Sequence, residues 1–173
     1  MAPKAERGFT LIELLIVVAI ISIIAAFAVP GLLRTRMTGF ETSAAVSLNA
    51  VAKAQLAYST GCGNGAFAAA LTVLYTPPGG LGEGYIGADL GMSATPQKSG
   101  YNFAMVGGQG SGAGPNDCNG TATVTGYYAT GVPMTPGTTG SRAFAINQSN
   151  IVWAVNGGVA PTEPFGPPAA PIQ

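Results

Sequence analysis

The side chain with the clearest capacity for specific chemistry in this sequence is the carboxylate of Glu13. It lies near the start of a long apolar stretch, in which no residue from Leu14 to Leu33 is charged. A carboxylate at the middle of a membrane costs about 2.5–3.5 kcal/mol on insertion scales, and less near the end of a segment. Because an isolated charge in apolar surroundings usually has a partner, the sequence predicts that Glu13 has one.

The rest of the sequence offers little catalytic chemistry. It has no histidine and only two cysteines, too few for a cysteine-built metal site. The acids of the second half are scattered; they are Glu83, Asp89, Asp117 and Glu163. The pattern Gly108-x-Gly110-x-x-Ala113 is a weak form of a dinucleotide fingerprint, but Pro115 follows it where a helix should begin. We therefore expect no enzyme activity, no cofactor and no metal ion.

The charge balance excludes a further class of function. Lysine and arginine number 7, aspartate and glutamate also number 7, and charged residues are 8% of the chain. Such a chain has no basic field with which to attract nucleic acid. We expect no direct nucleic-acid site.

The apolar stretch that follows Glu13 predicts a helix of membrane-spanning length. Residues 14–33 would rise about 30 Å as an α-helix, the thickness of the hydrocarbon core of a bilayer. One interpretation is a secretory signal peptide cut after Ala28, so that the mature chain begins at Val29. A second is a simple membrane anchor in which Glu13 has no special role.

A third interpretation comes from the residues around Glu13. The stretch Gly8-Phe9-Thr10-Leu11-Ile12-Glu13 follows a short basic leader, and Glu13 is the fifth residue after Gly8. This pattern resembles the processing site of bacterial type IV prepilins and of the related type II secretion pseudopilins. The resemblance covers residues 1 to about 60. It implies that the apolar helix stays on the mature protein, unlike an ordinary signal peptide.

The resemblance assigns roles to three residues. A prepilin peptidase would cut after Gly8, whose missing side chain suits a tight subsite, and would methylate the new amino group of Phe9. Glu13 would then accept the Phe9 amine of a neighbouring subunit and set the depth at which the incoming helix stops. The implied partners are other copies of the chain in a helical homopolymer, the peptidase, the membrane before assembly and the inner-membrane assembly machinery.

The helix is expected to continue beyond the membrane segment. Pro30 and Gly31 predict a kink or local unwinding, although Pro30 could alternatively end the membrane helix. Beyond them one apolar stripe follows helical spacing; its members are Leu33, Met37, Phe40, Ala44, Leu48 and Val51. The helix should reach about Tyr58 and stop at Gly61, so that residues 9–60 form one long element.

Residues 61–160 predict a small head built on an antiparallel sheet. Tyr101, Phe103 and Met105 alternate along one predicted strand. Residues 121–130 predict a second strand with Tyr128 on one face and Tyr127 on the other, and residues 142–155 predict a hairpin. Residues 66–78 favour a short helix ended by prolines. The sequence therefore predicts an α+β fold, in which a long N-terminal helix packs on a small sheet.

The sequence also makes predictions for the two cysteines of the head and for the proline-rich tail after it. Cys62 and Cys118 would lie in an oxidising compartment after translocation, so we expect a disulfide, although two free buried thiols are the alternative. Residues 161–173 are rich in proline and predict an extended, poorly ordered tail.

Taken together, these patterns favour a structural subunit of a type IV pilus that supports adhesion, motility or DNA uptake. It would occupy the inner membrane before assembly and the cell surface afterwards. The alternative is a type II secretion pseudopilin. Such subunits often bind calcium, and the dispersed acids here form no evident oxygen cage.

Overall fold

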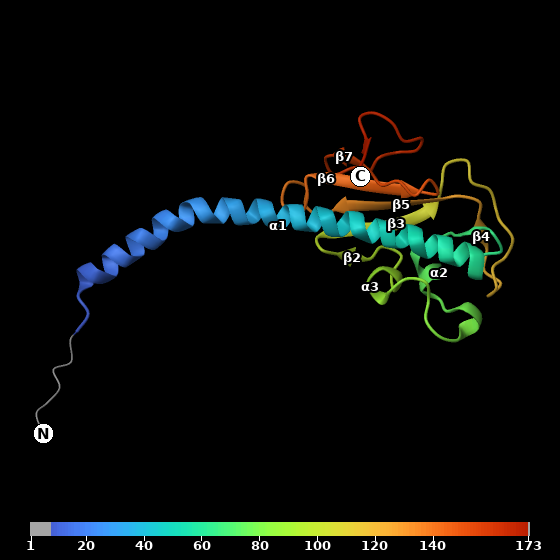
Figure 1. Cartoon of the computed structure of the whole chain (residues 1–173), viewed down its shortest axis with the longest axis horizontal. Coiled ribbons are helices and arrows are strands. Elements are labelled where there is room, and N and C mark those ends of the chain that lie inside the picture. The colour runs from blue at the N-terminus through green and yellow to red at the C-terminus, as the bar shows by residue number, and fades with distance from the viewer. Residues whose placement is uncertain (1–7, 173) are drawn as a thin grey trace, which may run out of the picture. The chain divides into compact units, whose positions relative to one another are not determined.

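A computed structural model describes residues 8–172 of the chain, which divide into two compact units, one up to Arg36 and one from Met37 onward (Figure 1). Residues 1–7, which hold most of the expected leader, lie outside the described residues. One long helix, α1 (Leu11–Gly61), contributes to both units. The first unit is otherwise only the residues that precede this helix, and the second unit is the head.

Helix α1 forms because its sequence is dominated by leucine, isoleucine, alanine and other residues that tolerate a helix, and because a polar cap starts it. Its end agrees with the predicted stop at Gly61. Within the head, its buried positions recur every three or four residues, as on one face of a helix. These buried positions are Glu41, Ala44, Ser47, Leu48, Val51, Ala52, Ala54, Gln55, Tyr58 and Ser59.

The head contains a six-stranded antiparallel sheet in the order β2-β3-β5-β6-β7-β8. Its strands are β2 (Gln97–Lys98), β3 (Tyr101–Gly107), β5 (Tyr127–Pro133), β6 (Arg142–Asn147), β7 (Trp153–Asn156) and β8 (Ala170–Pro171). A second, two-stranded sheet joins β1 (Phe67–Ala68) to β4 (Thr123–Val124). Short helices α2 (Leu71–Tyr75), η1 (Pro78–Gly80) and α3 (Ala88–Gly91) connect β1 to β2. The expected α+β fold is confirmed.

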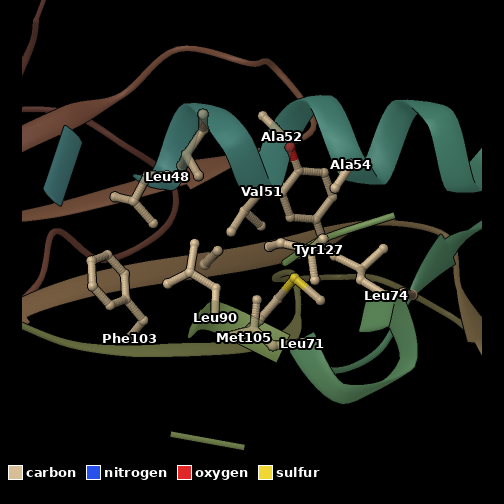
Figure 2. Packing of buried hydrophobic residues seen from close by; sticks show 14 of the residues in the cluster. Leu48, Val51, Ala52, Ala54, Leu71, Leu74, Leu90, Phe103, Met105 and Tyr127 are labelled. Carbon is tan, nitrogen blue, oxygen red and sulfur yellow. The ribbon is translucent and has the colours of Figure 1, made fainter. Parts of the chain in front are cut away.

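The core of the head lies between α1 and one face of the larger sheet. Figure 2 shows Leu48 and Val51 of α1 pointing toward Phe103 and Met105 of β3. Leu71 and Leu74 of α2 and Leu90 of α3 complete the same cluster, and all three are buried. The predicted alternation along β3 is confirmed, because Tyr101, Phe103 and Met105 are all buried.

The prediction that residues 121–130 form one strand is wrong. This stretch forms two strands, because β4 pairs with β1 whereas β5 pairs with β3 and β6. Tyr127 is nevertheless in the core and Tyr128 only partly buried, so the two lie on different faces as the alternation predicts.

The proline-rich end of the chain is also more ordered than predicted. Its last strand β8 pairs with β7, with Ala154 opposite Ala170 and Trp153 opposite Pro171. Ile172 packs against the hydrophobic core. On the other face of the sheet, the ring of Phe165 stacks on that of Trp153 at 5.5 Å between centroids. The poorly ordered tail expected for residues 161–173 is therefore corrected for the residues up to 172.

Several polar residues on the buried face of α1 are paired with the sheet region. The Gln55 amide exchanges two hydrogen bonds of 2.9 Å with the backbone of Ala68, so it continues the pairing of β1. Glu41 is buried and accepts hydrogen bonds from the Ser141 backbone N–H and hydroxyl, each at 2.7 Å. It also forms an ion pair with Arg142 at 2.8 Å. These contacts fix the register of α1 against the sheet.

Candidate functional site

The predicted processing site lies just before the first turn of α1. Gly8, Phe9 and Thr10 are outside the helix, which begins at Leu11. All three are exposed, and the Phe9 side chain is 74% exposed. A side chain added at Gly8 would meet no heavy atom within 4 Å. An enzyme that needs an extended backbone at this position would find it accessible.

Glu13 and Thr10 form a capping box at the start of α1. The Thr10 backbone N–H and hydroxyl both donate to Glu13 Oε2, at 2.9 and 2.7 Å. In return, the Glu13 N–H donates to Thr10 Oγ1 at 3.3 Å. This reciprocal arrangement satisfies backbone donors that the first helical turn leaves without partners. The spacing Thr-x-x-Glu was the sequence signal for it, and sequence reasoning missed it.

The capping box gives the Glu13 carboxylate a role within its own chain. In an isolated chain, this carboxylate has a local partner in Thr10, so its role is not limited to a contact with another subunit. Both Thr10 bonds end on Oε2, and among residues 8–172 no group donates to Oε1. The predicted pair with the Phe9 amine joins two subunits and stays a prediction.

The helix after Glu13 has the length and composition to cross a membrane, and it is the one such helix among the described residues. None of its most apolar window is buried within the chain. The polar side chains in and beside this region bond to their own helix. Ser22 donates to the Val18 carbonyl at 2.8 Å and Thr35 donates to the Gly31 carbonyl at 3.1 Å. These bonds reduce the cost of a hydroxyl in apolar surroundings.

Pro30 lies inside α1, which is continuous from Leu11 to Gly61. The structure therefore contradicts local unwinding at Pro30 and the alternative that Pro30 ends the helix. Pro30 has no N–H to donate to the carbonyl of Ala26, so the helix continues through Pro30 with one backbone hydrogen bond fewer. A kink at Pro30 and Gly31 stays a prediction.

The two cysteines form the predicted disulfide, which joins the end of α1 to the loop before β4 across 56 positions of sequence. The same region is held by the Tyr58 hydroxyl, which donates to Asp117 Oδ2 at 2.8 Å. Asp117 also accepts the backbone N–H groups of Asn119 and Thr121. Burial and the adjacent Asp117 carboxylate raise the pKa of Tyr58, so its hydroxyl stays a donor.

The acids considered in the sequence are not brought together. Asp89 pairs with Lys98 at 2.7 Å, whereas Glu163 accepts the Asn147 amide and the Gln109 N–H. Within residues 8–172, no group of three or more His, Cys, Asp or Glu side chains is placed to hold a metal ion. The glycine-rich stretch before Cys118 bonds to its neighbours through Gly112 and Gly114 and is followed by no helix.

Comparisons with known proteins address the N-terminal pattern. Residues 3–29 match the model described as the prokaryotic N-terminal methylation motif. The type IV wide pilus major component PilA4 of Thermus thermophilus is 47% identical over 55 residues, which are 32% of this chain and 42% of that protein. The type IV major pilin protein PilA of Myxococcus xanthus is 46% identical over 53 residues, which are 31% of this chain and 24% of that protein.

These matches leave most of the head without a counterpart. The aligned parts span less than half the length of either relative, and no solved structure matches the chain. The matched motif spans residues 3–29, a range that includes Gly8, Phe9 and Glu13 and the first part of the long apolar helix. The chain therefore carries the prokaryotic N-terminal methylation motif, and about a third of it is similar to parts of two type IV pilins.

Proposed function

We propose that the chain is a structural subunit of a type IV pilus. The observation that carries this proposal is an apolar helix with no charge from Leu14 to Leu33, exposed along its length, directly behind the Gly8–Phe9 motif. Such a helix is stable in lipid, where it would wait as an inner-membrane protein. In a filament, the same side chains would pack against those of other subunits. The assembled subunit would lie at the cell surface.

Processing would turn residues 1–8 into a discarded leader and leave a mature chain that starts at Phe9. A prepilin peptidase is the expected enzyme, and it would also methylate the Phe9 amine. The exposure of Gly8 and Phe9 supports access for this enzyme. The mature chain would then consist of the helix of residues 9–60, the head of residues 61–160 and the proline-rich tail of residues 161–173, which contributes the edge strand β8.

The assembly contact would join the Phe9 amine of one subunit to Glu13 of the next. Glu13 Oε2 serves Thr10 in the capping box, and Oε1 accepts no bond from residues 8–172. The carboxylate can therefore keep its cap and accept the neighbour's amine through the second oxygen. Bringing the two charges together in apolar surroundings would remove the penalty that each carries alone.

The two relatives favour a pilus over a secretion pseudopilin, because both are named as major pilus components. A major subunit would form a helical homopolymer with other copies of itself, assembled by inner-membrane machinery. Adhesion, motility or DNA uptake would then be properties of the filament. In this role the chain is a structural protein and not an enzyme.

The test is to shear surface filaments from the producing bacterium and measure the intact mass of the chain in them. We expect it to dominate the filaments and to begin at an N-methylated Phe9. A mature chain that begins at Val29 would contradict the proposal, because the apolar helix would then have been discarded. Absence of the chain from all surface filaments would contradict it too.

Two substitutions at Glu13 separate its two roles. Glu13→Gln keeps an oxygen for the capping box but removes the charge that pairs with the amine, whereas Glu13→Ala removes both. If the ion pair drives assembly, both variants are cleaved normally and both yield few filaments. If only the cap matters, Glu13→Gln assembles like the wild type, and the proposed pair is wrong. The amounts of filament and of cleaved chain are read on one immunoblot.

A further inference from the structure

Two charged side chains of the head have no partner. Most charged groups from residue 37 onward form an ion pair or accept hydrogen bonds; these are Glu41, Asp89, Lys98, Asp117, Arg142 and Glu163. Within the described residues, Lys53 and Glu83 form neither a hydrogen bond nor an ion pair. Both are exposed. Among residues 37–172, these are the two charged side chains of opposite sign that remain available to another molecule.

Glu83 lies in an apolar setting between α2 and α3, which pack side by side (Figure 1). It helps to line an open pocket of about 600 Å³ together with Tyr75 and Tyr85. Leu81, two residues earlier, is 83% exposed, and Met92 at the end of α3 is 70% exposed. We call Tyr75, Leu81, Glu83 and Met92 the loop surface. It combines large apolar side chains with one negative charge.

Lys53 lies on the face of α1 that points away from the core of the head. Val46 and Leu56 are seven residues before it and three residues after it, so all three share one side of the helix. Val46 and Leu56 are both exposed. We call Val46, Lys53 and Leu56 the helix surface. It combines large apolar side chains with one positive charge, and it complements the loop surface in sign.

We propose that the loop surface of one subunit binds the helix surface of a second copy, with Glu83 paired to Lys53. The proposal rests on the pilus function proposed above. The loop surface and the helix surface are different parts of one chain, so the contact between two copies is heterologous. A row of bound subunits then has an unoccupied loop surface at one end and an unoccupied helix surface at the other. Contacts of this kind build an open helical filament if they do not close into a ring. Apolar burial supplies the attraction, and the charge pair sets register.

Carbodiimide cross-linking of sheared wild-type filaments tests the contact directly, because it joins an amine to a carboxylate only where they touch. We expect covalent dimers on a denaturing gel, with peptides linked through Lys53 and Glu83. The Lys98–Asp89 pair within one subunit is an internal positive control, since its atoms are 2.7 Å apart. Filaments that contain the chain and show the control link but no Lys53–Glu83 link would overturn this contact while leaving the pilus function intact.

Charge reversal provides the second test. Lys53→Glu and Glu83→Lys each bring like charges together, and we expect each to lower the amount of filament about tenfold. The double variant Lys53→Glu with Glu83→Lys restores the attraction and should return the amount to within about twofold of the wild type. Lys98→Glu is the matched control, because it makes the same charge change within one subunit and should leave assembly unchanged.

The outcomes of charge reversal are distinct. If the double variant assembles no better than the single variants, Lys53 and Glu83 do not pair and the inference is wrong. If the wild-type chain is absent from surface filaments, the pilus function itself fails and the inference fails with it. Because the side chains of Lys53 and Glu83 are exposed and have no partner among residues 8–172, these variants should fold, which a thermal melt of each variant checks.

Discussion

The two units of the chain use apolar residues in opposite ways. From Leu11 to Leu33 the large apolar side chains are exposed, and Ile20 is typical at 53%. From Ala44 onward such side chains gather in a core, in which Leu48 is 1% exposed. Within its described residues, the first unit therefore has no internal packing beyond its own helix. The second has a core, an ion pair between buried Glu41 and partly exposed Arg142, and a disulfide.

The difference shows where the stability of each region comes from. The head gains its free energy from contacts within one chain, so it should stay folded whether or not a filament forms. The exposed helix gains almost nothing from the rest of its own chain and depends on lipid or on other helices around it. A subunit built in this way can leave the membrane for a filament without refolding its head.

The largest expected effect is on removal of the leader after Gly8, and therefore on the amount of surface filament. Gly8→Val should leave the leader on the chain and abolish surface filaments, because a branched side chain would block a tight peptidase subsite. Gly112→Val is a matched control, since Gly112 also has open space around its Cα and lies in an exposed loop. Immunoblots of membranes and sheared filaments read the result. Normal filaments from Gly8→Val would contradict processing at this site.

The next largest effect concerns the head alone. Replacing Cys62 and Cys118 together by serine should lower the free energy of unfolding of the head by about 4 kcal/mol, because the bond constrains a long loop in the unfolded chain. Denaturant unfolding of the full chain in detergent, followed by tyrosine and tryptophan signals, measures this. Reducing the wild type should produce the same shift. An unchanged midpoint in both cases would show that the core alone holds the head together.

A pair of matched truncations compares the two units directly. Leu48→Ala should destabilise the head by about 3 kcal/mol through lost burial and a cavity. Ile20→Ala removes a similar side chain from the exposed helix and should change the unfolding of the head by less than about 0.5 kcal/mol. The same detergent unfolding assay reads both. An equal effect of the two variants would mean that the units are not independent.

The smallest expected effect concerns the buried acid of the head. Burial acts to raise the pKa of Glu41, but hydrogen bonds from Ser141 and Arg142 outweigh it, so the pKa lies below its ordinary value. A lowered pKa adds stability above the ordinary value of about 4.3, and this stability is lost as the pH falls through the pKa of the folded state. Glu41→Gln should cost about 2 kcal/mol at pH 7.

The pH dependence distinguishes this ion pair from a general loss of packing. Thermal melts between pH 7 and pH 3 should show a smaller loss of stability for Glu41→Gln than for the wild type. Asp89→Asn is the control, because the hydrogen bond from Lys98 also lowers the pKa of Asp89, but at an exposed position where solvent screens the charge. If both variants lose stability with pH as steeply as the wild type, Glu41 does not carry the pH dependence.

Much of the fold could be predicted because it depends on local patterns. The apolar run fixes the helix, the period of three and four fixes the face that carries Leu48 and Val51, and alternation fixes β3. The prediction of one strand over residues 121–130 was wrong because this apparent strand is divided between two sheets. The order of the last residues was missed because proline content was taken to exclude pairing, although an edge strand tolerates proline.

The contacts of the candidate site were harder to predict. The sequence does not predict the burial of Glu41, because its partners Ser141 and Arg142 are about a hundred residues away and sequence spacing gives no sign of them. The capping box at Thr10 and Glu13, in contrast, was readable from the spacing of two residues. Local polar contacts can be inferred from sequence, whereas long-range ones require the fold.

The two outer strands of the larger sheet are each two residues long, and one of them ends in Pro171. Such short borders present few free backbone groups, and a proline presents no donor at all. Where many identical heads lie close together, longer edge strands would favour hydrogen-bonded pairing between the sheets of neighbouring heads. Because the edge strands of this sheet are short, the heads can be packed closely without strand pairing between them.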